Sequence, residues 1–374
     1  MRDLNKFKGC LIGGAVGDAL GYAVEFMSAD AIFKKYGDKG ITGYELRNGV
    51  AEISDDTQMT LFTANGLLIR TTGSMTYGIT ADYTDCIAHC YGDWYKTQME
   101  QYPPSGEKHY SWLVNIPEMF SRRAPGNTCL SALAHGGNGT LDNPINDSKG
   151  CGGVMRTAPI GLYFANGNYD SMPQKEIDLI GAKAAALTHG HELGYIPAAA
   201  LAHIINLLVK NDKITVLDAV ADSVVSMRKI FKESENIKQF HKLMEKAADL
   251  AVSSANDIDA IRQLGEGWVA EEALAIAVYC AVKYSDNFEQ GIIAAVNHDG
   301  DSDSTGAVAG NILGTALGFD AIPQKFIDNL ELKDVILEIA EDLHHDCQSS
   351  EYGSSDILWK SKYIDMTYKK KHLI

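Results

Sequence analysis

The chain has 374 residues, 45% of them hydrophobic, enough for one large domain or two ordinary ones. Its 33 Lys and Arg against 49 Asp and Glu give a formal charge of −16, which argues against broad nucleic-acid binding and against docking on anionic membranes. Seven scattered cysteines without a C-x-x-C motif fit free thiols in a reducing compartment, and no apolar run is long enough to span a membrane, so we expect a cytoplasmic protein.

The stretch GGAVGDALGYAVEF, which begins at Gly13, predicts a helix with a small-residue face suited to close packing. Asp18 and Glu25 are seven residues apart and would lie on the same side of that helix. A tightly packed helix with two carboxylates near one end would explain the pattern without any chemistry.

The next feature is ISDDTQMTLF, residues 53–62. Ser54 can cap the helix that follows, and Asp55 and Asp56 favour the positive N-terminal end of that helix. Capping is the more common reason for such a sequence. A hydroxyl and two adjacent carboxylates could also form half of a binding site for a hard divalent metal.

Apolar residues recur at helical spacing along most of the chain, and alternation typical of strands is nearly absent apart from a short hairpin within 40–54. We therefore predict an all-α, single-domain protein over 1–374, with the motif-bearing core at about 5–320 and a peripheral C-terminal segment at 321–374. Residues 100–150 are the least helical part, which predicts a functional or mobile loop region. Helices are predicted within 55–70, 81–98, 174–190, 196–210, 215–231 and 270–284.

A glycine-rich turn, KGCGGVMRTAPIG, begins at Lys149. Its backbone could approach a phosphate closely, although it is neither a Walker A loop nor a G-x-G-x-x-G motif, and a plain turn before a helix is the more common explanation. Arg156 could anchor a phosphate or form a structural ion pair. The stretch ALTHGHELG adds His189 and His191.

The stretch NHDGDSDSTG, residues 297–306, places Asp299, Asp301 and Asp303 at alternate positions. Converging carboxylates repel one another unless a cation lies between them. An EF-hand is excluded, because Ser304 and Gly310 stand where it needs Gly and Glu. A solvated turn remains possible, but two distant acidic, hydroxyl-rich helix starts favour one or two Mg²⁺ or Mn²⁺ ions held jointly with residues 54–56.

Together these motifs resemble the ADP-ribosylglycohydrolase family. The resemblance rests on GGAVGDALGYAVEF, SDDTQMTL, RAPGNTCLSAL, GCGGVMRTAPIGL, LTHGHELG, GEGWVAEEALAIAVYC and HDGDSDSTGAVAGNILG, in that order. It implies an orthogonal bundle of α-helices with a two-metal cleft. The implied reaction is hydrolysis of the N- or O-glycosidic bond that joins ADP-ribose to an acceptor.

The resemblance also implies roles for individual residues. Glu25 corresponds to the glutamate near the scissile bond, and Asp303 is expected to bridge both ions and to share in catalysis. The expected metal ligands are Ser54, Asp55, Asp56, Asp301, Asp303 and Ser304. The expected substrate contacts are Ser148, Gly150, Cys151, Gly152, Gly153, Val154, His189 and Trp268.

Two positions depart from the family pattern. Cys151 stands where many relatives have Asn, which puts one side-chain contact to the ligand in doubt. Asp299 is Gly in several relatives, so it is expected to lie outside the site.

The leading expectation is a metal-dependent hydrolase that releases ADP-ribose from arginine on a modified protein. Alternatives are hydrolysis of O-linked ADP-ribose (ADP-ribosylserine or O-acetyl-ADP-ribose), a metal-dependent phosphohydrolase that would release AMP, and a non-catalytic relative that binds ADP-ribose. Loss of the acidic residues would mark the non-catalytic relative, and here the four metal aspartates and Glu25 are all present. The choice of acceptor is expected to depend on loops such as 100–150.

Overall fold

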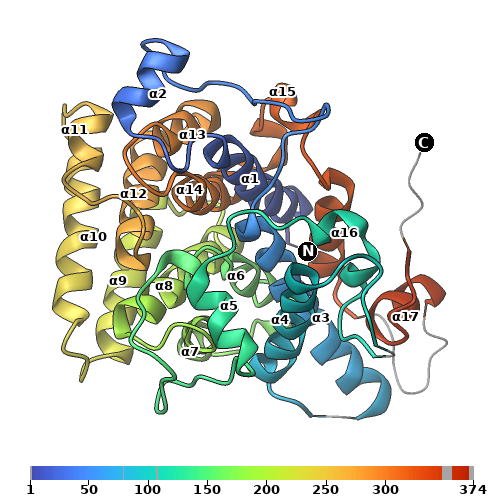
Figure 1. Cartoon of the computed structure of the whole chain (residues 1–374). Coiled ribbons are helices and arrows are strands. Elements are labelled where there is room, and N and C mark those ends of the chain that lie inside the picture. The colour runs from blue at the N-terminus through green and yellow to red at the C-terminus, as the bar shows by residue number, and fades with distance from the viewer. Residues whose placement is uncertain (1, 79, 107, 348–355, 370–374) are drawn as a thin grey trace.

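The protein is described by a computed structural model that covers residues 2–78, 80–106, 108–347 and 356–369. Helices make up its regular structure, and the described residues contain only isolated β-bridges and no sheet, which confirms the all-α prediction (Figure 1). The α-helices are α1 (Leu4–Tyr22), α2 (Ala29–Tyr36), α3 (Asp55–Tyr77), α4 (Tyr83–Met99), α5 (Asn127–Ala134), α6 (Ala158–Tyr163), α7 (Gln174–Ala186), α8 (Glu192–Lys210), α9 (Val216–Ile230), α10 (Ile237–Ala251), α11 (Asp257–Ile261), α12 (Ala270–Lys283), α13 (Phe288–Val296), α14 (Ser302–Leu317), α15 (Gln324–Ile327), α16 (Lys333–His345) and α17 (Ile357–Tyr363). Short 3₁₀ turns cover Trp112–Asn115, Pro117–Phe120, Cys151–Gly153, Gly167–Tyr169 and Phe319–Ala321.

Helices α1 and α14 lie side by side at the centre of the bundle and run antiparallel (Figure 1). Glycines face each other along the contact. A Cβ on Gly9 would lie 2.1 Å from the carbonyl oxygen of Gly314, and one on Gly17 would lie 1.9 Å from that of Gly306. Only residues without a side chain allow two backbones to come this close. The predicted small-residue face therefore sets the distance between the two central helices.

Helix α1 ends at Tyr22, earlier than the sequence suggested. Glu25 lies in the turn that follows, so the expectation that Asp18 and Glu25 share a helix face is wrong. Asp18 points toward α3, and Glu25 lines a pocket. The two carboxylates therefore occupy different environments, despite their helical spacing.

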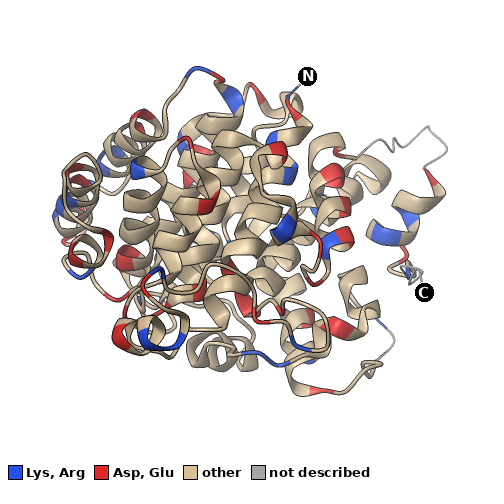
Figure 2. Ribbon diagram, turned by 90° about the horizontal axis from the view of Figure 1, so that it is seen from above, with Lys and Arg blue, Asp and Glu red and all other residues tan. Residues whose placement is uncertain are grey.

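Helix α8 has the length and mean hydropathy of a membrane span, but 83% of its 18-residue apolar window is buried inside the fold. It packs against α7, α6 and α9. This is the pattern of a core helix that is hydrophobic all round. Lys, Arg, Asp and Glu gather mainly on the outer helices and loops (Figure 2).

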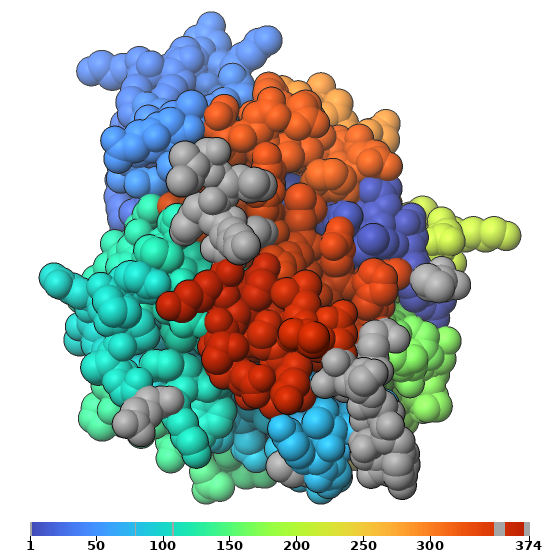
Figure 3. Space-filling view, turned by 90° about the vertical axis from the view of Figure 1, so that its right-hand side faces the viewer, coloured from blue at the N-terminus to red at the C-terminus, as the bar shows by residue number. Residues whose placement is uncertain are grey.

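The C-terminal part of the chain lies on one face, beside the segment around residues 100–120 (Figure 3). Asn115 donates from Nδ2 to the backbone oxygens of Met366 and Tyr368, at 2.9 and 3.1 Å. Lys362 is buried and pairs with Glu338 and Asp342, each at 2.7 Å. These contacts hold α17 against the body of the protein.

Candidate active site

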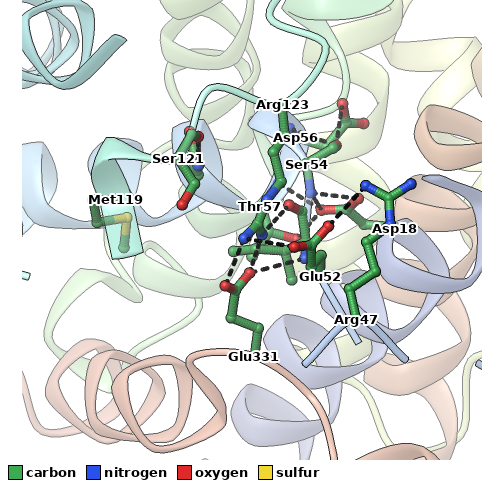
Figure 4. Close-up of polar contacts among 12 residues, drawn as sticks. Asp18, Arg47, Glu52, Ser54, Asp56, Thr57, Met119, Ser121, Arg123 and Glu331 are labelled. Carbon is green, nitrogen blue, oxygen red and sulfur yellow. Dashed lines mark hydrogen bonds and ion pairs between the residues drawn. The ribbon is translucent and has the colours of Figure 1, made fainter. Parts of the chain in front are cut away.

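A buried carboxylate from α1 holds the start of α3 in place. Ser54 is the N-cap of α3, and its Oγ accepts a hydrogen bond from the backbone N–H of Asp56 at 3.2 Å. Asp18 accepts hydrogen bonds from the backbone N–H groups of Ser54 and Thr57, at 3.0 and 3.1 Å, and from the Thr57 hydroxyl (Figure 4). A carboxylate at this end of a helix also interacts favourably with the helix dipole. Asp18 thus fixes the position of Asp55 and Asp56 without lining the pocket itself.

A buried ion pair braces the residues that precede α3. Both terminal nitrogens of Arg123 meet the carboxylate of Glu331, with Nη2 2.8 Å from Oε1, and Nη1 also donates to the backbone oxygen of Ile53 at 3.0 Å (Figure 4). Glu52 is a second carboxylate partner of Arg123, at 3.4 Å. Bidentate pairs of this kind fix geometry as well as adding energy. The neighbouring Arg122 is exposed and lines the pocket instead.

The start of α14 is the second acidic segment. Asp301 is its N-cap, with a side chain that accepts from the backbone N–H of Ser304 at 3.2 Å. A Cβ on Gly21 of α1 would lie 2.6 Å from the Cα of Asp303. The antiparallel contact of the two helices therefore brings the end of α1, and Glu25 after it, to the start of α14.

These segments meet at a pocket of about 460 Å³. It brings together residues from the turn after α1, from the starts of α3 and α14, and from four other segments, namely 122–129, 150–155 and the loops that contain His189 and Trp268. Of the residues predicted from the sequence, those that line it are Glu25, Asp55, Asp56, Gly150, Cys151, Gly152, His189, Trp268, Asp301, Asp303 and Ser304. Those that do not line it are Ser54, Ser148, Gly153 and Val154.

A larger cavity of about 630 Å³ lies near α11 and α13, lined by residues such as Asp257, Tyr284 and Asn297. None of the predicted site residues lines it. Volume alone does not identify a functional site, whereas titratable groups with strongly perturbed pKa values in a cleft are a physical indication of one. We therefore regard the smaller pocket as the candidate active site.

Burial raises the pKa of the Asp55, Asp56 and Asp303 carboxyls well above their usual range, and the neighbouring carboxylates add to the effect. The pKa of Glu25 is raised to about 9, first by burial and then by the charges of Asp301 and Asp55. Carboxyls with these shifts are all ionised together only when cations lie among them, and otherwise some of them bind protons. The pocket therefore has a strong tendency to take up positive charge.

The chemistry of these donors fits a hard divalent cation. All the candidate ligands offer oxygen, which suits Mg²⁺ or Mn²⁺. Among the described residues, Asp56 Oδ1 and Glu25 Oε2 are buried and have no hydrogen-bond partner. Within the same described part of the chain, no three His, Cys, Asp or Glu side chains already converge on one point. The donors share a pocket, but they do not form a preformed coordination shell.

The glycine-rich turn contributes one edge of the pocket and one part of the core. Cys151 donates from its backbone N–H to the oxygen of Trp268 at 3.2 Å, and from Sγ to Asp301 Oδ2 at 2.9 Å. Gly153 is turned away, and a Cβ there would lie 2.8 Å from the backbone oxygen of Gly194 on α8. Val154 has no exposed surface. Of the predicted phosphate turn, residues 150–152 therefore line the pocket, as does Met155 just beyond the predicted residues.

Arg156 pairs with no carboxylate in the part of the chain that the structure describes. Its side chain is completely buried and lies over the ring of Tyr91, with 4.3 Å from Cζ to the ring centroid. Its Nη2 donates to the backbone oxygen of Ala184 at 3.1 Å and to Thr188 Oγ1 at 2.7 Å. Among the described residues Arg156 therefore forms no ion pair, and it is not one of the residues that line the pocket.

His189 follows α7 and lines the pocket beside the glycine-rich turn. A Cβ on either Gly150 or Gly152 would lie 3.3 Å from its Nε2. Burial and then the charge of Arg156 lower the pKa of His189 to about 3. The ring is therefore neutral at physiological pH, and it can offer a ligand a hydrogen bond but not a charge.

Two aromatic rings stack at the pocket, and the sequence predicted one of them, Trp268. Trp268, which is 38% exposed, stacks on Phe26, with centroids 6.0 Å apart and planes at 19°. Phe26 was missed, although its place next to Glu25 in the sequence was a usable signal. Arg122, Asn127 and other residues of the segment 122–129 also line the pocket. The sequence located this loop region but not these individual residues.

Asp299 lies outside the pocket lining. Its Oδ1 accepts from the backbone N–H of Ala29 at 2.8 Å, and its Oδ2 pairs with Arg262 at 3.1 Å. It therefore joins the start of α2 to the loop before α12. Of the three alternating aspartates, the two later ones reach the pocket.

Known proteins of similar sequence and fold support this description. The chain is 26% identical over 329 residues to the ADP-ribosyl-[dinitrogen reductase] glycohydrolase of Rhodospirillum rubrum, covering 87% of this chain and 90% of that protein. It is 24% identical over 356 residues to the ADP-ribosylarginine hydrolase Tri1 of Serratia proteamaculans strain 568, covering 91% and 80%. A solved structure described as an ADP-ribosylglycohydrolase-related protein complex superimposes with a TM-score of 0.62 at 22% identity, covering 91% of this chain and 98% of that one.

The sequence profile of the family described as ADP-ribosylglycohydrolase matches residues 1–353, which is nearly the whole chain. The fold, the order of the motifs and this match agree with one another. The protein belongs to the ADP-ribosylglycohydrolase family, whose members hydrolyse glycosidic bonds of ADP-ribose.

Proposed function

We propose that this protein is a metal-dependent hydrolase that releases ADP-ribose from arginine side chains of modified proteins. One observation carries the proposal: carboxylates from three separate segments line the same pocket as the glycine-rich turn and a neutral histidine. The acidic part suits a sugar bound with divalent cations, and the turn suits a diphosphate. The arginine acceptor is favoured by the name of the Tri1 relative.

The glycine-rich turn and His189 would bind the diphosphate and the ribose next to it. Gly150 and Gly152 have no side chain to keep a ligand from the backbone, and His189 adds a neutral ring beside them. The adenine would lie against Trp268, whose ring is partly exposed at the pocket. Base–aromatic stacking of this kind tolerates a range of orientations.

Glu25 is the candidate for proton transfer. Hydrolysis breaks the bond from the anomeric carbon to the acceptor nitrogen through an oxocarbenium-like state, and the oxygen of water forms the new bond. One proton of that water has to reach the leaving nitrogen. Glu25 lines the pocket in a turn beside Asp303, where it could hold the water and carry this proton.

Two Mg²⁺ or Mn²⁺ ions would supply Lewis-acid binding of the ribose hydroxyls and would lower the pKa of a nearby water. The residues proposed to hold them are Ser54, Asp55, Asp56, Asp301, Asp303 and Ser304. Ser54 is also the cap of α3, and so it would contribute mainly by keeping Asp55 and Asp56 in place.

The test is a set of three substrates that carry ADP-ribose on arginine, serine or glutamate, with Mg²⁺ or Mn²⁺ present and with EDTA as a control. We expect free ADP-ribose from the arginine substrate and none after EDTA treatment. Release from the serine substrate alone would replace arginine by an O-linked acceptor. Release of AMP would indicate a phosphohydrolase, and binding of ADP-ribose without turnover of any substrate would indicate a non-catalytic relative.

A further inference from the structure

The two ring nitrogens of His189 have different surroundings. Nδ1 lies 2.8 Å from Thr188 Oγ1, inside the protein. Nε2 has no hydrogen-bond partner among the described residues, and its edge of the ring faces Gly150 and Gly152 at the pocket. A neutral histidine carries one proton, so its tautomer decides whether the pocket meets a donor or an acceptor.

The partner of Thr188 on its other side is Arg156. Its Nη2 lies 2.7 Å from Thr188 Oγ1, and a guanidinium can only donate. Thr188 therefore accepts from Arg156 and must direct its own hydrogen elsewhere. The available acceptors are His189 Nδ1 at 2.8 Å, the backbone oxygen of Ala185 at 3.5 Å and the sulfur of Cys129, which accepts only weakly. The distance to Nδ1 is normal for a hydrogen bond, whereas 3.5 Å is too long for a strong one.

The tautomer protonated at Nδ1 would form poorer hydrogen bonds in the same geometry. If His189 carried its proton on Nδ1, it would donate to the same oxygen that already accepts from Arg156. The hydroxyl of Thr188 would then be left with the distant oxygen of Ala185 and the weakly accepting sulfur of Cys129. Arg156 cannot move to relieve this arrangement, because it is completely buried against Tyr91 and held by the backbone oxygen of Ala184.

We infer that Thr188 and Arg156 are positioning residues that hold His189 as the tautomer protonated at Nε2. The pocket thereby gains a fixed, uncharged N–H donor beside Gly150 and Gly152. Such a donor recognises an acceptor oxygen of the ligand, either a ribose hydroxyl or a diphosphate oxygen. The identity of the ligand rests on the proposed function, whereas the tautomer is a property of the free protein.

The first test is therefore made without ligand. Protein labelled with ¹⁵N in its histidines is measured at pH 7.5 by long-range ¹H–¹⁵N correlation, with His189→Gln identifying the His189 signals. We expect a protonated Nε2 and an unprotonated Nδ1 in the wild type and in Thr188→Ser, and a changed tautomer ratio in Thr188→Val. Thr315→Val removes an equally buried hydroxyl at the far end of α14 and should leave these signals unchanged. Protonation at Nδ1 in the wild type would overturn the inference.

The second test is a double-mutant cycle on ADP-ribose affinity, measured by calorimetry. Thr188→Val should weaken binding about tenfold, the effect of one misdirected hydrogen bond, and Thr188→Ser should restore it. In a His189→Ala background the same change should have no further effect, because Thr188 acts only through His189. An equal loss in both backgrounds would refute the positioning role. If the wild type binds no ADP-ribose, the proposed function fails, while the tautomer measurement still decides this inference.

Discussion

Substitution of Gly17 by Ala tests whether the glycine contact between α1 and α14 places the active site. A Cβ at this position would lie 1.9 Å from the carbonyl oxygen of Gly306 and 2.3 Å from its carbon. Ordinary contact begins at 3.4 Å, so the backbones have to separate by about 1.5 Å, the difference between 3.4 and 1.9 Å. The obstacle is backbone in a second buried helix and cannot rotate away.

Two opposing effects determine the magnitude. Alanine is intrinsically favoured over glycine inside a helix by about 1 kcal/mol. Overpacking a well-packed core costs about 1–3 kcal/mol and occasionally more. Here the whole helix pair has to move, so overpacking should cost about 3–5 kcal/mol, and the net loss in the free energy of unfolding should be about 2–4 kcal/mol. For a chain of this length that corresponds to a fall of about 2–5 °C in Tm.

The assay is denaturant unfolding of Gly17→Ala beside a matched control, Gly73→Ala. Gly73 also lies inside a helix, but a Cβ there would meet nothing within 4 Å. The control should therefore gain up to about 1 kcal/mol from helix propensity alone. Gly17→Ala should also bind Mn²⁺ more weakly, because it separates the end of α1 from the start of α14. A Gly17→Ala protein as stable as Gly73→Ala would refute the idea that this contact sets the helix spacing.

Three further predictions concern the pocket. Asp303→Asn should weaken Mn²⁺ binding, measured by electron paramagnetic resonance, by more than about tenfold, whereas Asp299→Asn should change it little; equal losses would mean that the wrong aspartates were assigned to the metal. Glu25→Gln should retain ADP-ribose affinity but lose about 10²–10⁴-fold in kcat, and near wild-type turnover would remove Glu25 from the chemistry. The lowered pKa of His189, about 3, means that the unfolded chain binds a proton that the folded protein does not between about pH 6.5 and 3. The free energy of unfolding should therefore decrease as the pH is lowered through this window, by up to about 1.4 kcal/mol per pH unit relative to His189→Asn. Parallel stability curves for the two proteins would contradict this prediction.

The sequence by itself determined the class of fold and the family. Helical periodicity is a local property, so helices such as α9 and α12 were predicted close to their observed bounds. The residue types at the starts of α3 and α14 favour hard-metal chemistry, because each start alone could be a helix cap but two distant acidic, hydroxyl-rich starts together suit oxygen-ligand binding of a cation. The glycines of α1 indicated a close helix contact, since a missing side chain is visible in the sequence even when its neighbour is not.

Only the tertiary structure decided which of these groups meet. Glu25 was expected on the helix, but α1 ends before it, and the turn directs Glu25 to the pocket and leaves Asp18 to hold the start of α3. Gly152 faces the pocket, whereas Val154, in the same motif, faces the core. These outcomes depend on contacts between residues far apart in the chain, and such contacts leave no periodic signal in the sequence. Arg156 lies in the core and is connected to the pocket through Thr188 and His189 and through Cys129, and these surroundings are for the same reason a property of the folded protein alone.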